Sequence, residues 1–140
     1  MLINIATYLW FEAGDMSGGS RNQIEFSDDL ASFFDDDART SGRVFVAYDK
    51  VTKAFCPLTN RAQDYGQWTN IWRLGLITKA KGGVEYQGRV IGLEKRKIGK
   101  SYVYVIAVTD LNSAEHKHWV EKSKGKGITG GAEGRNYGYF

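Results

Sequence analysis

The chain has 140 residues, of which 42% are hydrophobic and 14% aromatic, and it carries a formal net charge of +3. This size and composition predict a single folded domain with its own core, and they exclude a chain that is disordered over most of its length. No apolar stretch approaches the roughly 20 residues needed to span a bilayer, and no basic leader opens the chain. We therefore expect a protein without a membrane segment that is cytoplasmic when made or part of a viral particle.

The charge is divided unevenly along the chain. Residues 1–66 contain 6 Lys and Arg against 10 Asp and Glu, whereas residues 67–140 contain 13 against 6. Such a dipolar chain can attract a polyanion or stack head to tail on its own copies, and charge alone does not choose between the two. The single cysteine, Cys56, cannot form an internal disulfide. Without an identifiable base nearby, we interpret it as a packing residue.

The acidic half predicts a strand, a helix and a hairpin in that order. Residues 2–11 are apolar on both strand faces, which predicts a covered strand. Residues 27–38 predict a helix, because Ser27 can cap the first turn and apolar residues then recur at i, i+3 and i+4. Residues 42–58 predict a hairpin that turns near Asp49. Proline at position 57 cannot donate to a ladder, so it marks an edge or the end of the second strand.

The centre of the fold is expected over residues 71–111, as three antiparallel strands joined by two basic turns. In the middle strand Val90 and Ile91 interrupt the alternation between Gly88 and Gly92, which predicts a β-bulge. Residues 101–109 are apolar on both faces, which predicts a covered, central strand. The expected fold class is α+β, mainly an antiparallel sheet or a small β-barrel with this central meander.

The C-terminal region predicts a short helix followed by a tail. The helix is expected over residues 113–122, with Asn112 or Ser113 as its cap. Residues 123–140 are glycine-rich and should not fold alone, so we expect one globular domain over 1–122 and a separate tail. The tail can lie against its own chain, a neighbouring subunit or a ligand, held by the aromatic side chains that bury most area. The expected contact residues are Tyr137, Tyr139 and Phe140 in the tail, with Tyr65 and Trp68 in a polar stretch nearer the middle of the chain.

His116 and His118 are the only histidines, and they lie in the one cluster that resembles a catalytic or metal site. On a helix these positions point apart, which weakens a shared metal site, so we expect no metal and no cofactor. A general acid–base role beside Lys95, Arg96 or Lys97 would suit a small ribonuclease. The alternative is two surface histidines on a polar helix, and we expect a protein that is not an enzyme.

A cluster of basic residues is better supported as a functional feature than the two histidines. It belongs to the two turns and the middle strand of the meander, which would spread it as a stripe along the sheet edge. Such a stripe with aromatic neighbours is typical of a nucleic-acid surface, although basic turns also keep sheet edges unpaired. The candidate nucleic-acid contacts are Lys79, Lys81, Arg89, Lys95, Arg96, Lys97 and Lys100.

Three functional hypotheses follow. The first is a non-enzymatic subunit of a larger assembly, such as a viral one, which docks on its own copies or on another protein through its tail and basic turns. The second is a nucleic-acid-binding module that uses residues 79–100 and the tail to bind DNA or RNA. The third is a small ribonuclease-like hydrolase that uses His116 and His118. None of the three involves a membrane.

Overall fold

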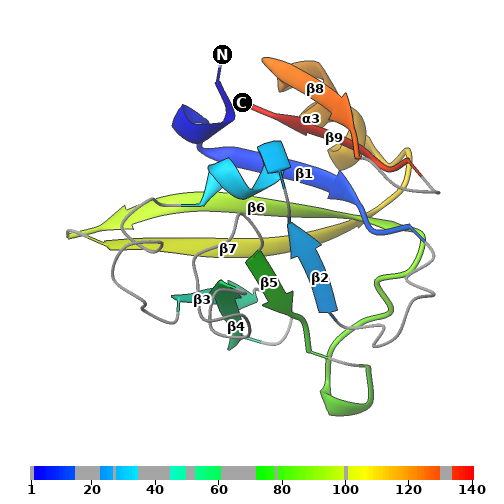
Figure 1. Cartoon of the computed structure of the whole chain (residues 1–140). Helices are drawn as coiled ribbons and strands as arrows, with labels where there is room; N and C mark the ends of the chain where they lie inside the picture. The colour runs from blue at the N-terminus through cyan, green and yellow to red at the C-terminus, as the bar shows by residue number, and fades with distance from the viewer. Residues whose placement is uncertain are drawn as a thin grey trace.

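The computed structural model describes residues 2–14, 23–26, 28–34, 45–49, 53–60, 72–77, 79–99, 101–129 and 134–140. Within these ranges the chain forms one nine-stranded sheet in the order β2-β5-β4-β3-β7-β6-β1-β9-β8 (Figure 1). Neighbouring strands are antiparallel except for β3 and β7, which are parallel. The α+β class is confirmed. The sheet ends at β2 and β8, so it is open rather than closed into a barrel.

The strands are β1 (Tyr8–Glu12), β2 (Gln23–Phe26), β3 (Phe45–Asp49), β4 (Ala54–Asn60), β5 (Trp72–Gly75), β6 (Arg89–Ile98), β7 (Ser101–Asp110), β8 (Gly125–Ile128) and β9 (Asn136–Tyr139). The helices of the described residues are the 3-10 helices η1 (Ile3–Ile5), η2 (Asp28–Phe33) and η3 (Lys79–Lys81), and the α-helix α3 (Ala114–Lys122). No helix of these residues is long and apolar enough to cross a membrane.

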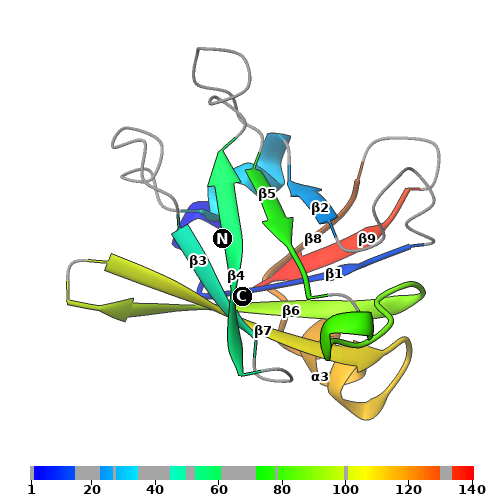
Figure 2. The same cartoon turned by 90° about the horizontal axis from the view of Figure 1, so that it is seen from below.

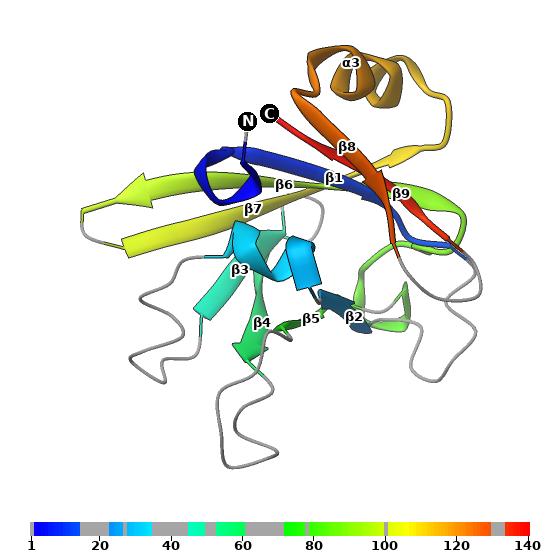
Figure 3. The ribbon, with the colours of Figure 1, turned by 45° about the horizontal axis from the view of Figure 1, so that its top comes forward.

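The main core lies on one face of the β1–β6–β7 part of the sheet. The half that contains β2 to β5 packs over this face, whereas α3 covers the other face (Figures 2 and 3). Aromatic rings join the two halves of the sheet. The rings of Phe11 and Phe26 meet edge to face with their centroids 5.0 Å apart, and those of Phe34 and Tyr104 lie 5.1 Å apart. This main core therefore depends on contacts between residues distant in sequence.

The central meander forms only in part. The strand predicted over residues 101–109 is β7, which is central and buried as expected, and it forms a hairpin with β6. The first strand, β5, pairs with β2 and β4 instead of β6. Gly88 shortens the middle strand, because its φ of +72° places a turn within the stretch from Val84 that was expected to be extended. The alternation of side chains between the two sheet faces therefore restarts at Arg89. From there β6 pairs with β7 residue by residue, without the predicted bulge.

The first half of the chain differs from the prediction mainly in the lengths of its elements. Residues 3–5 form η1, so the N-terminal strand begins only at Tyr8. The helix expected over 27–38 is the 3-10 helix η2, while residues 27 and 35–38 lie outside the described ranges. The β3–β4 hairpin is confirmed. Pro57 lies opposite Val46 of β3, and pairing of β4 with β5 starts only at Leu58, so the proline faces a local edge as predicted.

The helix predicted over 113–122 is confirmed as α3, and Ser113 is its cap. The Ser113 side chain accepts a hydrogen bond from the backbone N–H of His116 at 3.1 Å. Asn112 cannot take the cap position, since it adopts a left-handed φ of +61°. Its backbone N–H donates instead to Nδ1 of His116 at 2.9 Å. Both candidate cap residues therefore fix the first turn of α3 and the ring of His116.

The tail lies against its own chain. Its strands β8 and β9 form a hairpin, and β9 pairs with β1. Glycines make the close approach of aromatic rings possible. A Cβ on Gly138 would lie 2.6 Å from Nε1 of Trp10, and the rings of Tyr139 and Tyr137 cover the positions of Gly125 and Gly127. The tail thus adds two strands to the same sheet as the preceding residues.

Candidate functional site

The end of the β6–β7 hairpin that carries Ile98 and Ser101 projects from the rest of the described chain as a bare two-stranded ribbon. Pairing of β1 with β6 ends at Glu94, and pairing of β3 with β7 starts at Tyr104, whereas β6 and β7 pair with each other up to Ile98 and Ser101. We call residues 96–103 the β6–β7 ribbon. Figures 1 and 2 show that it extends beyond the rest of the described chain. Among the described strands it has no neighbour on either side.

The three basic residues at the base of this ribbon are held differently. Lys95 is directed towards the body, with its Nζ 4.5 Å from the ring centroid of Phe33. Arg96 points to the opposite face and donates to both carboxylate oxygens of Glu94, at 2.8 and 3.2 Å. This hydrogen bond also raises the pKa of Arg96. Lys97 is exposed, and its Nζ lies 6.0 Å from the ring of Tyr102 on the neighbouring strand. Of the three, Lys97 has the charge most open to a ligand.

The other basic candidates are not brought to the ribbon. Arg89 starts β6, about nine residues and hence about 30 Å of strand away from Ile98, and forms an ion pair with Asp110 at 3.4 Å. Lys79 and Lys81 are exposed on η3, also far from the ribbon (Figure 2). Lys100 lies outside the described residues. The stripe expected along a sheet edge is wrong in one respect, because β6 is an interior strand between β7 and β1.

The predicted contact residues of the tail are packed within the chain. The rings of Tyr137 and Tyr139 pack against the main core. Phe140 stacks on Tyr8 with centroids 5.0 Å apart and planes within 8°, and Nζ of Lys122 lies 5.3 Å from its ring. The other two predicted contact residues, Tyr65 and Trp68, lie outside the described residues.

The two histidines do not converge. His118 is exposed on α3, whereas His116 is buried against Trp10 with ring centroids 5.2 Å apart. Burial lowers the pKa of His116, and the nearby carboxylate of Glu12 opposes this shift. His116 lies at the end of β6 that carries Arg89, so the ribonuclease arrangement with Lys95, Arg96 and Lys97 is not assembled. Within the described ranges, no group of three or more His, Cys, Asp or Glu residues is placed to hold a metal ion.

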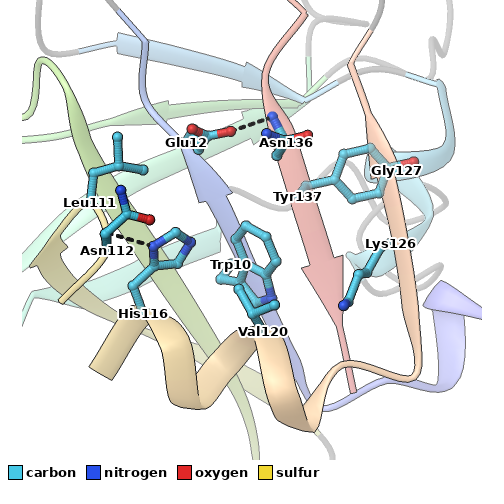
Figure 4. A pocket seen from close by; sticks show the side chains of 10 residues that line it. All are labelled: Trp10, Glu12, Leu111, Asn112, His116, Val120, Lys126, Gly127, Asn136 and Tyr137. Atoms are coloured by element: carbon cyan, nitrogen blue, oxygen red, sulfur yellow. Dashed lines mark hydrogen bonds between the residues drawn. The ribbon is translucent and has the colours of Figure 1, made fainter. Parts of the chain in front are cut away.

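A cleft lies between α3 and the C-terminal hairpin, and we call it the α3 cleft (Figure 4). It has a volume of about 410 Å³ and adjoins a second cavity of about 370 Å³ that shares Glu12 and Leu111 with it. The first cavity is lined by Trp10, Glu12, Leu111, Asn112, His116, Val120, Lys126, Gly127, Asn136 and Tyr137. The second is lined by Glu12, Gly14, Gly88, Arg89, Leu111, Gly134 and Arg135.

Hydrogen bonds fix the walls of the α3 cleft. Glu12 accepts a hydrogen bond from the backbone N–H of Asn136 at 2.7 Å, which ties β1 to β9 beside the cleft. Trp10 donates its indole N–H to Oγ of Ser123 at 2.8 Å, and this hydroxyl in turn donates to the carbonyl of Trp119. Trp10 and Glu12 were not predicted as site residues from the sequence. Their i, i+2 spacing on a strand places them on one face, but the elements that cover this face are α3 and the tail.

Comparisons of the chain with protein-family models, with curated proteins and with solved structures found no match.

Proposed function

We propose that the protein is a non-enzymatic nucleic-acid-binding module that places its β6–β7 ribbon in the major groove of duplex DNA. The observation that carries this proposal is the bare ribbon with an exposed Lys97 at its base. A two-stranded ribbon has the width that the major groove of B-DNA admits, about 12 Å. Lysine ammonium groups along such a ribbon can reach phosphates on the groove walls.

The side chains of the ribbon suit contacts with the phosphate backbone more than contacts with the edges of the bases. Lys97 and Tyr102 share one face, so a cation and an aromatic ring are presented together, as in surfaces that track a phosphate backbone. Arg96 is already bound by the carboxylate of Glu94 and contributes less charge. We therefore expect salt-dependent binding with little sequence preference, in which Lys97 contributes more than Arg96.

The test is a titration of labelled duplex DNA, single-stranded DNA and RNA across a salt series. We expect binding at low salt that weakens as salt rises, and a flatter salt dependence in the Lys95→Ala, Arg96→Ala, Lys97→Ala triple variant. The matched control is Lys79→Ala, Lys81→Ala, which removes exposed lysines from η3, away from the ribbon. No binding at low salt, or an equal effect of the two variants, would contradict the proposal.

The free edge of the sheet supports a second candidate function, a subunit of a larger assembly. Thr129 donates its backbone N–H to the carbonyl of Arg135 at 2.8 Å. This bond shows which alternate residues of β8 direct their backbone groups towards β9. By that alternation, the backbone groups of Lys126 and Ile128 point away from β9. The Ile128 side chain is 67% exposed beside this edge. The proposed assembly forms when a strand of a second copy adds to β8.

Mass photometry of the intact chain and of Lys126→Pro tests this second candidate. Proline removes one outward N–H without removing a bond to β9, so we expect a wild-type oligomer that the substitution dissociates. Removal of the tail is a poor test, because it would also strip β9 from β1. A wild-type protein that is monomeric at working concentration would rule out the assembly function.

A further inference from the structure

We propose that the α3 cleft binds a mononucleotide, with the edge of its base against Glu12 and His116 and its phosphate in the adjoining cavity. This site is separate from the β6–β7 ribbon and does not depend on the function proposed for the ribbon. Its volume of about 410 Å³ falls within the range of about 300–1,000 Å³ that is usual for small-ligand pockets.

The α3 cleft borders a buried donor that has no hydrogen-bond partner among the described residues. His116 is only 7% exposed, and its Nε2 is buried without a partner among the described residues. Nδ1 accepts the N–H of Asn112, so the neutral ring must carry its proton on Nε2. In Figure 4 this atom lies on the side of the ring that faces Trp10 and the cleft. A buried donor without a partner is costly, and a ligand acceptor would remove this cost.

The ring of Trp10 offers only a partial alternative. The two rings meet at 69° with centroids 5.2 Å apart, so the Nε2–H can approach the indole face. An N–H to π contact is weaker than a conventional hydrogen bond, and it leaves the buried donor incompletely satisfied. The Trp10 indole N–H itself is occupied by Ser123, so it does not compete for a ligand.

The same cleft also presents an acceptor. Glu12 uses Oε1 for the N–H of Asn136, and a carboxylate has lone pairs for further donors. A ligand that serves both groups needs a donor for Glu12 and an acceptor for His116 along one edge. Nucleobases carry this amide-like edge, and so do simple carboxamides. The apolar side chains of Leu111 and Val120 line the same cavity and suit the faces of a planar ring.

The positive charge around the two cavities favours a nucleotide over an uncharged amide. Lys126 lines the first cavity, and Arg89 and Arg135 line the second. Arg135 donates from Nη1 to the carbonyl of Ala13 at 3.0 Å, so among the described residues one of its five donors holds the guanidinium in place. A phosphate in the second cavity would lie between two guanidinium groups, which bind phosphate well.

Calorimetric titration of the full chain with the four nucleoside 5′-monophosphates tests the proposal. Separate titrations with the nucleosides, with inorganic phosphate and with glutamine amide distinguish base, phosphate and carboxamide recognition. We expect saturable binding of at least one mononucleotide that is tighter than its nucleoside, and perturbation of the His116 and Trp10 side-chain NMR signals. Glu12→Gln should weaken this binding about tenfold to a hundredfold, since it removes a charged acceptor.

The matched control is Lys124→Ala, an exposed cation next to β8 that does not line either cavity. It should leave mononucleotide affinity unchanged, whereas Arg135→Ala should reduce it to that of the nucleoside. Thermal unfolding of each variant shows whether the fold is kept. The proposal is overturned if no mononucleotide binds, if inorganic phosphate or glutamine amide binds as tightly, or if Glu12→Gln retains full affinity while folded.

Discussion

The two ends of β6 carry similar basic residues but lie in different surroundings. At the Arg89 end the strand has neighbours on both sides, α3 covers one face, and the arginine is paired with Asp110. At the Lys97 end β7 is the one described strand that remains beside it, and the lysine is exposed. The comparison shows that neighbouring elements, and not residue type, decide which basic residues of this strand are open to a nucleic-acid duplex, whereas Arg89 lines a cavity.

Trp10 should be the residue on which the enclosed end depends most. It is 3% exposed, packs beside Val90 and Trp119, and donates to Ser123. We expect Trp10→Ala to lower the free energy of unfolding by about 3–5 kcal/mol in urea denaturation, because it opens a large cavity. Lys97→Ala, at the bare end, should change it by less than about 0.5 kcal/mol. Equal effects of the two substitutions would remove the distinction between the ends.

Gly138 gives the next largest effect. A Cβ there would lie 2.6 Å from Nε1 of Trp10 and 2.7 Å from Oγ of Ser123. We expect Gly138→Ala to cost about 1–3 kcal/mol through overpacking. Lys126→Ala, at the paired position of β8, is the control and should be near neutral, since its side chain is exposed. A neutral Gly138→Ala would mean that the indole is not held against β9 as described.

Ser123→Ala should have a smaller effect on the same contact. The substitution removes the acceptor of the Trp10 indole N–H and the donor to the carbonyl of Trp119. We expect a loss of about 1 kcal/mol in the free energy of unfolding, as for one part-buried hydrogen-bonded group. Ser123→Thr keeps the hydroxyl and serves as the control. If both substitutions cost the same, the hydroxyl is not the stabilising group.

His116 should give the smallest effect, visible as a dependence on pH. Its pKa is lowered in the folded state, chiefly by burial, so the unfolded chain binds a proton more readily. Stability should therefore be fully present above about pH 6.5, the usual histidine pKa, and fall as the pH decreases towards the folded value. Urea denaturation from neutral to mildly acidic pH should show this slope, and His116→Gln should flatten it. His118→Gln, on the exposed side of α3, should leave the slope in place.

The elements with strong local signals could be predicted from the sequence. The two apolar faces of residues 101–109 identified β7 as a central strand, and Ser113 was one of two caps proposed for α3. Pairing between distant segments could not be predicted. Alternation suggests that β5 is a strand, but nothing local indicates that it pairs with β2 and β4.

The two candidate sites differ in the same way: one is built from neighbouring residues, and the other from segments far apart in the sequence. The basic ribbon lies within a hairpin of consecutive strands, so its residues could be named from the sequence. The α3 cleft joins β1 to elements more than 100 residues later, through contacts such as that of Glu12 with Asn136. Trp10 and Glu12 were missed because a glycine-rich tail carries no signal for the strand on which it will pack. His116 was named, but its burial depends on Trp10, far away in sequence.

The most direct test of the account compares the two ends of β6 in nucleic-acid binding. Fluorescence anisotropy of a labelled duplex over a salt series gives the slope of log Kobs against log salt concentration. For Lys97→Ala we predict a slope smaller by about 1, the value of one lost phosphate contact, and for Arg89→Ala an unchanged slope. Equal slopes for Lys97→Ala and the intact chain, or a larger effect of Arg89→Ala, would contradict the role assigned to the ribbon.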